Sequence, residues 1–166
     1  MFFGCMGRLA ALLMVPVAVF LASCDLFQST SAPAGMEQEV LDGKFAFIVT
    51  QVDTSRTFSH TRAEGVYVIV SMAVRNVGTE AQFFEWAAQR LKASAGREYS
   101  PSFMVPSLFG DNVVNSIDPG LQVNVKLAFD VQPGTKPTQI VLHDSLSSHG
   151  AAVNLTQPPS PPTPRG

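Results

Sequence analysis

The sequence predicts an all-β fold of the sandwich type, preceded by a cleaved signal segment and a flexible tether. The stretch LQVNVKLAFDV, residues 121–131, alternates apolar and polar residues without a break. Such alternation is the pattern of a strand with one buried and one wet face. Turn signals containing glycine and proline also recur between short apolar segments, as in sandwiches of antiparallel strands.

The first 23 residues have the order of a signal peptide. Arg8 precedes an uncharged apolar run from Leu9 to Ala22, as in export signals. The run is shorter than the about 20 apolar residues of a membrane-spanning helix, and Pro16 interrupts it. We therefore expect residues 1–23 to be removed. The alternatives are an ordinary secretory signal in which Cys24 is a chance residue, and an uncleaved anchor.

The residues Leu21-Ala22-Ser23-Cys24 resemble the bacterial lipobox. The resemblance implies that Cys24 receives a diacylglyceryl thioether, becomes the first mature residue and anchors the chain to the membrane, on the extracytoplasmic face of the cell envelope. Cys5 would leave with the signal, so Cys24 would have no partner for an intramolecular disulfide. Asp25 follows directly and resembles the signal that retains lipoproteins at the inner membrane of envelopes with two membranes.

The segments that flank the predicted domain carry no sustained strand or helix period. Residues 24–39 are rich in Ser, Ala, Pro and Gly and predict a flexible tether. Residues 156–166, TQPPSPPTPRG, predict an extended polyproline II tail. A solvated spacer is favoured over a recognition role for this tail. The folded domain is therefore predicted at residues 40–155.

Short strands follow one another through the predicted domain. The segment VYVIVSMAV, residues 66–74, is apolar on both alternations and predicts a central strand that is covered on two sides. The segment EAQFFEWAAQRLKA, residues 80–93, is the one helix candidate, and the choice between a short helix and an extended segment stays open. The other predicted strands are residues 45–49, a hairpin over 91–99, residues 121–131, 140–142 and 153–155.

The predicted domain has the size of an immunoglobulin-like β-sandwich, since about 115 residues correspond to one such domain. The Cys…Trp…Cys spacing of antibody domains is absent from the sequence. The core must therefore be held by packing rather than by a disulfide between its sheets.

Five segments together resemble the telokin-like immunoglobulin-fold domain of bacterial exported proteins and lipoproteins, which is related to a secreted mycobacterial antigen family. These segments are KFAFIVTQV, VYVIVSMAVRNVG, LKASAGREYSP, SIDPGLQVNVKLAFDVQPG and QIVLHD. The resemblance covers nearly all of the predicted domain. It implies a fold and a location outside the cytoplasm, and it carries over no functional residue because the family has no established catalytic motif.

The histidines do not predict a metal or catalytic site. Neither His60 nor His143 has a Cys, Met or second His at ligand spacing, and surface or loop histidines are the favoured interpretation for these two and for His149. His143-Asp144 is half of a catalytic triad, but the nearby serines 145, 147 and 148 lack a nucleophile-elbow motif. The sequence therefore predicts no catalytic residue, no metal and no cofactor.

Three segments are candidate binding surfaces. The polar insert DTSRTFSHTRAEG, residues 53–65, is predicted as a long loop, with a mobile connector favoured over a binding loop. Phe83, Phe84 and Trp86 either stack on a sugar or peptide or fill the core. The segment FMVPSLFG, residues 103–110, is broken by Pro106, lacks strand alternation and would be a partner surface if exposed.

The favoured function is a non-enzymatic, lipid-anchored protein whose domain binds an envelope protein or assembles with an envelope complex. The alternative is a receptor for a small ligand such as a carbohydrate, peptide or metal, which would use the aromatic cluster or the His60 loop. The formal net charge of -2 is too close to neutral for electrostatic binding of nucleic acid. The expected partners are therefore the membrane, through Cys24, and another envelope protein.

Overall fold

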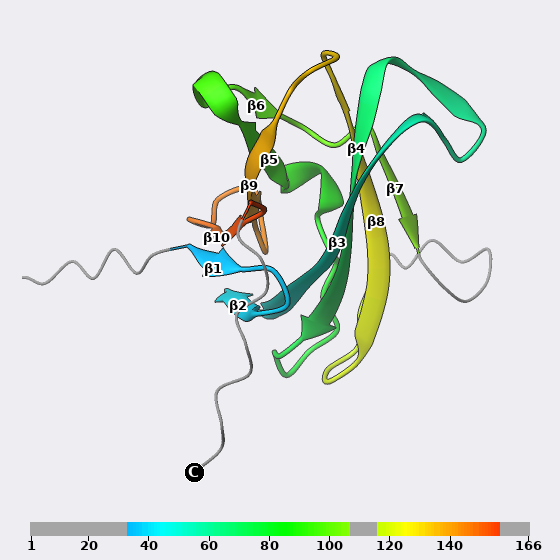
Figure 1. The fold of residues 1–166 in the computed structure, drawn as a ribbon. Helices are drawn as coiled ribbons and strands as arrows, with labels where there is room; N and C mark the ends of the chain where they lie inside the picture. Colours follow the sequence, from blue (N-terminus) through cyan, green and yellow to red (C-terminus); the bar gives the residue numbers. More distant parts are fainter. Residues whose placement is uncertain (1–32, 107–115, 157–166) are drawn as a thin grey trace, which may run out of the picture. The chain divides into compact units, whose positions relative to one another are not determined.

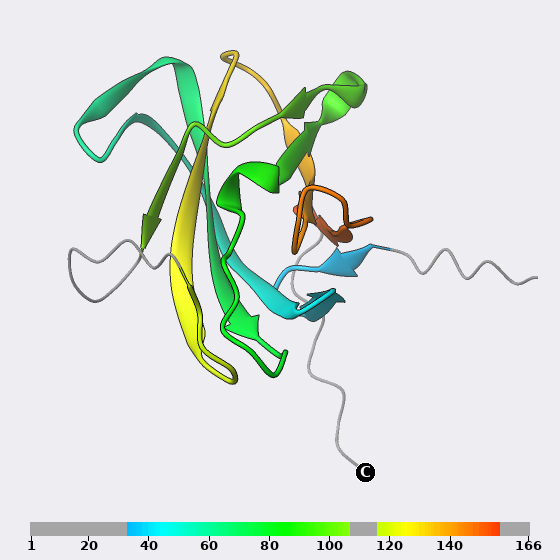
Figure 2. The same cartoon turned by 180° about the vertical axis from the view of Figure 1, so that it is seen from behind.

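The structure, a computed structural model, describes residues 33–106 and 116–156 (Figure 1). Its strands form two five-stranded sheets, with the orders β1-β10-β9-β5-β6 and β2-β3-β4-β8-β7. The strands are β1 (Ala34–Gly35), β2 (Glu39–Asp42), β3 (Phe45–Phe58), β4 (Thr61–Asn76), β5 (Arg90–Ala93), β6 (Glu98–Tyr99), β7 (Phe103–Pro106), β8 (Gln122–Val131), β9 (Pro137–Leu142) and β10 (Ala151–Asn154). The two sheets lie face to face, as the views from front and back show (Figures 1 and 2). The predicted all-β, immunoglobulin-like sandwich is confirmed.

The central strand is β4, which pairs antiparallel with β3 on one side and with β8 on the other. Val68, Val70 and Met72 are buried in the core shared with residues of β5, β9 and β10 in the other sheet. Tyr67 and Ile69 lie on the opposite face of β4 and are also buried, in a smaller cluster with Ala63 and Ala128 and with Phe58 packed against it. This strand therefore has both faces covered, as its unbroken apolar sequence predicts.

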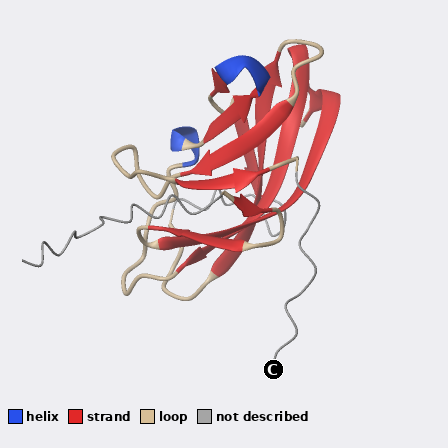
Figure 3. Ribbon diagram, turned by 60° about the vertical axis from the view of Figure 1, so that its left-hand side comes forward, coloured by secondary structure: helices blue, strands red, loops and turns tan. Residues whose placement is uncertain are grey.

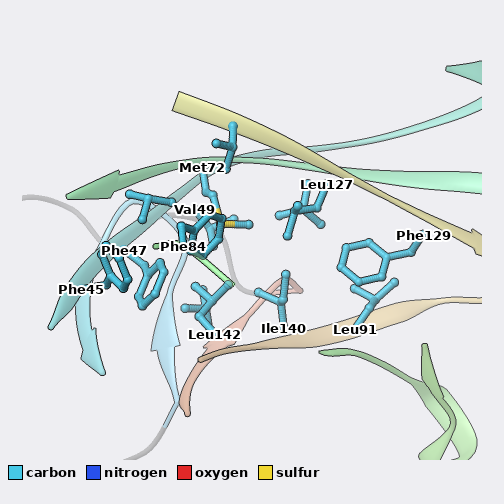
Figure 4. Packing of buried hydrophobic residues seen from close by; sticks show 14 of the residues in the cluster. Phe45, Phe47, Val49, Met72, Phe84, Leu91, Leu127, Phe129, Ile140 and Leu142 are labelled. Atoms are coloured by element: carbon cyan, nitrogen blue, oxygen red, sulfur yellow. The ribbon is translucent and has the colours of Figure 1, made fainter. Parts of the chain in front are cut away.

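The core between the sheets is filled by large apolar side chains from both layers (Figure 4). The rings of Phe45 and Phe84 meet edge to face at a centroid distance of 5.9 Å. Phe47 lies 6.1 Å from Phe84. Leu127 and Phe129 of β8 and the predicted strand residues Leu91, Ile140 and Leu142 complete the packing. Packing without a disulfide thus accounts for the contact between the layers.

The polar segment 53–65 is a hairpin end and not the predicted loop. It belongs to the far parts of β3 and β4, which pair as far as Phe58 and Thr61. These parts project beyond the other sheet, β1-β10-β9-β5-β6 (Figure 1). Ser59 and His60 form the turn with φ values of 45° and 70°. Polar residues suit this part because few of its side chains have a facing layer to pack on.

The segment at residues 103–106 also differs from its prediction. It forms β7, an edge strand that pairs antiparallel with β8 from Ala128 to Val125, although its sequence lacks alternation. Pro106 is tolerated because it stands at the end of an edge strand. Residues 107–110 lie outside the described part of the chain, so the predicted partner surface over 103–110 remains a prediction.

The sandwich begins before residue 40. Strand β1, inside the segment that was predicted as a tether, pairs in parallel with β10 through Ala34 and Val153. The amide of Glu37 also donates a hydrogen bond to the carbonyl of Val49 at 2.8 Å. A short apolar-poor strand such as β1 gives no periodic signal, because its contribution is made by backbone pairing.

The segment at residues 80–93 resolves into a short 3-10 turn and a strand. Trp86–Ala88 form the turn, and β5 follows from Arg90. Strand β5 pairs with β6 across a turn at Ser94–Gly96, which confirms the predicted hairpin. Cys24 and the predicted signal-peptide residues lie outside the described part of the chain. Within residues 33–106 and 116–156, no helix has the length and apolar character needed to span a membrane.

Gly65 allows β4 to approach the end of β8 closely. Its amide and that of Glu64 donate hydrogen bonds to the Asp130 carboxylate, at 3.0 and 2.8 Å. A Cβ at position 65 would lie 2.1 Å from the carbonyl oxygen of Val131, so we expect Gly65→Ala to lower the free energy of unfolding by about 1–3 kcal/mol in urea titrations. Gly35→Ala is the matched control, because its Cβ would meet nothing closer than 3.9 Å. Equal losses in the two variants would contradict this reading of the close contact.

Tyr67 makes stability depend on alkaline pH. Burial raises the pKa of its hydroxyl above the ordinary 10.0, and the Asp130 and Glu64 carboxylates raise it further. The folded state therefore holds this proton more tightly than the unfolded state. The contribution of Tyr67 to the free energy of unfolding is fully present below about pH 10 and is lost as the pH rises further. We expect Tyr67→Phe to flatten the decline of Tm between about pH 9 and 11. An unchanged slope would show that Tyr67 does not contribute.

Candidate functional site

The turns and loops at one end of the sandwich bring together several residues that the sequence singles out separately. This end, called here the Asp144 end, comprises residues 41–45, 76–89, 116–121 and 143–150, which connect strands of both sheets. In Figure 3 most of these connections are the tan segments between the red strands. The hairpin turn at His60 lies at the opposite end of β3 and β4. The Asp144 end therefore gathers Phe83, His143 and Asp144 but not His60.

The loop 143–150, between β9 and β10, is held against β2 and the following turn of the other sheet by two aspartates. The Asp42 carboxylate accepts hydrogen bonds from the amides of Asp144 at 2.7 Å and Gly150 at 3.2 Å. The Asp144 carboxylate in turn accepts one from the amide of Lys44 at 3.3 Å. These bonds join segments about 100 residues apart. Asp42 and Asp144 thus position the loop instead of offering free carboxylates.

Gln89 fixes the start of the same loop from inside the protein. It is fully buried, and its side chain bonds both backbone groups of His143, accepting from the amide at 2.7 Å and donating to the carbonyl at 2.9 Å. Its amide nitrogen also donates to the carbonyl of Glu85 at 2.8 Å. The side chain therefore replaces missing backbone pairing between residues 85–89 and residue 143.

Asn76 has the same role on the other side of this end. It is buried, and its Nδ2 donates to the carbonyls of Glu80 and Ile117 at 2.8 and 2.7 Å. Its Oδ1 accepts a hydrogen bond from the amide of Gly78 at 2.8 Å. The turn after β4 and the segment before β8 are thereby fixed relative to each other.

A cleft of about 520 Å³ opens between these segments. Phe83 and Leu146 supply its exposed apolar surface, and Lys44, Glu85 and Asp144 its charged groups. A second hollow of about 330 Å³ shares Leu146 and is lined by Arg90, Lys92, Glu98, His143 and His149. The first cleft has a volume in the range of ligand sites, and its lining combines three apolar side chains with six polar or charged ones.

The serine, histidine and aspartate of this loop are not arranged as a triad. Ser148 Oγ donates its proton to the carbonyl of Ser145 at 3.1 Å. His143 Nδ1 lies 3.2 Å from both the carbonyl oxygen and Oγ of Ser148, so an Nδ1 proton satisfies these contacts. A catalytic histidine would instead accept the serine proton and be oriented by a carboxylate, whereas Asp144 bonds Lys44. The arrangement closes a turn.

The residues 33–106 and 116–156 contain no group of three or more His, Cys, Asp or Glu side chains that could hold a metal ion. His60 stands at the hairpin turn, and His143 and His149 line the smaller hollow. The sequence-based expectation that the chain binds no metal stays a prediction.

The three aromatic residues of the sequence cluster have different environments. Phe84 is 3% exposed and belongs to the core, whereas Phe83 is 51% exposed. Trp86 is partly buried against the core. The cluster is therefore not one stacking platform, and Phe83 is the member that faces the cleft. Leu146 was not identified from the sequence, because an isolated leucine in a polar loop carries no local signal.

Comparison with known proteins extends the fold assignment. A family model described as "Domain of unknown function (DUF4352)" matches residues 34–153. The fold is similar to MPT63, a secreted protein from Mycobacterium tuberculosis, with a TM-score of 0.53 and 14% identity over 76% of this chain and 98% of that chain. It is also similar to the yjhA protein from Bacillus subtilis, with a TM-score of 0.55 and 13% identity over 74% and 99%. None of the curated proteins matches the sequence significantly.

Proposed function

We propose that the chain, which belongs to the family described as a domain of unknown function (DUF4352), is a non-enzymatic protein-interaction module of the cell envelope. A lipid on Cys24 holds it at the extracytoplasmic face of the membrane. The observation that carries the proposal is the Asp144 end, where a cleft with the exposed apolar side chains of Phe83 and Leu146 opens beside ordered loops. The lipobox-like residues before Cys24 and the likeness of the fold to a secreted protein support the location.

The path of the chain into the sandwich fits a short anchor. Ten residue steps separate Cys24 from Ala34, and they span roughly 33–36 Å at full extension. Strand β1 runs parallel to β10, which leaves the loop 143–150 at Ala151, so the chain enters β1 from the side of the Asp144 end. A domain on such a tether stays close to the bilayer and meets partners at the membrane surface.

The hydrogen bonds of the loop 143–150 support a binding role over catalysis. Asp42 and Asp144 bond backbone amides, and Ser148 and His143 close a turn. General acid–base chemistry needs a group with a proton to accept or give at the substrate. These side chains are instead occupied in shaping the surface.

The experiment that tests the anchor is fractionation of cells that produce the full-length chain. We expect the wild type in the membrane fraction and Cys24→Ala outside it, because the thioether is the proposed attachment. Cys5→Ala is the matched control and should behave as the wild type, since Cys5 lies in the segment that is removed. Cys24→Ala that is still cleaved and membrane-bound would contradict the proposal.

A small-ligand receptor is the second candidate function, and the volume of the cleft favours it. About 520 Å³ lies within the range of small-molecule sites, and Phe83 offers one aromatic face. A ligand that binds the folded state raises Tm by mass action. A carbohydrate or peptide that raises Tm in the wild type, but not in Phe83→Ala, would favour the receptor over the interaction module.

A further inference from the structure

We propose that the Asp144 end is the docking surface for a protein partner that presents an aliphatic or aromatic side chain flanked by lysine or arginine. This inference rests on the proposed function and names the surface and the chemistry of its partner. Five large apolar side chains are exposed among residues 33–102 and 116–156, and they lie at this end, with exposed fractions from 41% to 75%. They are Leu41, Val77, Phe83, Leu121 and Leu146.

The segments that carry the exposed apolar residues are joined to one another at this end. The amide of Val77 donates to the carbonyl of Lys44, and the amide of Asn76 donates to the carbonyl of Leu121. Lys44 Nζ reaches Gln82 Oε1 at 3.3 Å, and the cleft joins Lys44 to Phe83 and Leu146. Phe83 and Leu146 thus line one cleft, and exposed apolar side chains that share one surface mark interaction sites, whereas single exposed apolar residues do not.

The surface is ordered before any partner arrives. The buried side chains of Gln89 and Asn76 fix the segments at residues 85, 80 and 117 by hydrogen bonds. Asp42 fixes both ends of the loop that carries Leu146. Association then costs less conformational entropy than it would with free loops.

The charges around the apolar surface decide which partner fits. On the side of Phe83 the cleft is lined by the carboxylates of Glu85 and Asp144 and by one cation, Lys44, which is bonded to Gln82. Glu80 and Asp118 add carboxylates to the adjoining segments, near the paired residues Gln82 and Ile117. The cationic Arg90 and Lys92 belong to the separate hollow beyond Leu146, and the Arg90 guanidinium donates to the Ala87 and Gln89 carbonyls.

Acidic side chains around the cleft attract a basic partner and repel surfaces that carry negative charge. An anionic bilayer would meet these carboxylates with like charge. A second copy related by a two-fold axis would place the same acidic side chains against themselves. An apolar protein segment with flanking Lys or Arg is therefore the occupant that the observed chemistry fits, with its apolar side chain in the cleft beside Phe83.

The test is photo-cross-linking in the cells that naturally produce the full-length chain. The probe is p-benzoyl-phenylalanine at position 83, with the same probe at Thr61, in the opposite hairpin, as the control. We expect position 83 to yield an adduct with one protein, attached within an apolar segment that has Lys or Arg neighbours. Glu85→Lys should lower its yield roughly tenfold by charge repulsion, whereas Glu64→Lys, near the other end of β4, should not.

Each other result overturns the proposal. An adduct with lipid would assign the surface to the membrane, and an adduct with a second copy would assign it to self-association. An adduct with a partner segment that lacks basic residues, or one that is insensitive to Glu85→Lys, would refute the charge argument. The probe at Leu146, which is 75% exposed, replaces position 83 if that variant does not fold, and no adduct from either position refutes the surface.

Failure of this inference is distinguishable from failure of the proposed function. Adducts from Thr61 without any from position 83 or 146 would leave an interaction module that uses another surface. Loss of the unsubstituted chain from the membrane fraction would instead remove the anchor on which both depend.

Discussion

Replacing Phe84 with alanine is expected to lower the free energy of unfolding by about 3–5 kcal/mol, as truncation of a buried aromatic side chain does. Phe84 is 3% exposed, and its ring meets that of Phe45 edge to face at a centroid distance of 5.9 Å. The centroid of the Phe47 ring lies 6.1 Å from that of Phe84. These rings fill the core where it meets the Asp144 end, so the cavity left by alanine cannot be closed without moving both strand β3 and the segment before Trp86. Equilibrium denaturation in urea measures the loss.

The neighbouring residue provides the matched control. Phe83→Ala removes the same ring from a side chain that is 51% exposed, and we expect its effect on stability to stay below about 1 kcal/mol, as for other exposed positions. Two variants with similar losses would contradict the assignment of Phe84 to the core and Phe83 to the cleft. A stable Phe83→Ala protein also provides the folded variant that binding experiments need.

Replacing Gln89 with leucine is the change with the second largest expected effect. Leucine has a similar size but leaves the amide and carbonyl of His143 and the carbonyl of Glu85 without their partner. Buried polar groups left without a hydrogen bond cost about 1–3 kcal/mol each. We expect a loss of about 2–4 kcal/mol in the free energy of unfolding, since relaxation and water recover part of that sum.

Gln122→Leu is the control for Gln89→Leu. Gln122 begins β8 and is exposed, so the same chemical change should alter stability by less than about 0.5 kcal/mol. The two variants should also differ in amide hydrogen exchange, with faster exchange at His143 in Gln89→Leu than in the wild type. Unchanged exchange at His143 would show that Gln89 does not hold the loop.

Several strands could be predicted because periodicity reports burial directly. The two apolar faces of residues 66–74 indicate the central strand, since β3 and β8 flank β4. The alternation in residues 121–131 likewise predicts β8, which begins one residue later than the alternating segment does. Leu121 precedes the strand and is 55% exposed, because the turn at Gly120 takes it out of the alternation.

The hairpin end and β7 could not be predicted from periodicity, because backbone pairing rather than apolar alternation keeps them extended. Residues 53–58 continue β3 where few side chains face a second layer, and their polar composition is typical of a loop. Backbone pairing with β4 keeps them extended. Strand β7 is short and lies at an edge, where the partner backbone of β8 determines the conformation more than its own side chains do.

The candidate site needs tertiary structure, because its parts come from four segments. The sequence points to Phe83 and to His143-Asp144 separately, but it does not show that Asp42 bonds the Asp144 amide across 102 residues. Leu146 and Val77 are single apolar residues in loops. Their exposure becomes meaningful only when the fold places Leu146 in one cleft with Phe83 and Val77 at the same end.

The intact mass of the protein extracted from membranes tests the central claim, that this domain works from a lipid anchor. The account predicts a chain that begins at Cys24, with residues 1–23 removed and the mass of the acyl groups added, on the peptide that contains Cys24. A chain that begins elsewhere, or that carries Cys24 as an unmodified thiol, would contradict the lipid anchor and the proposed position of the domain close to the bilayer.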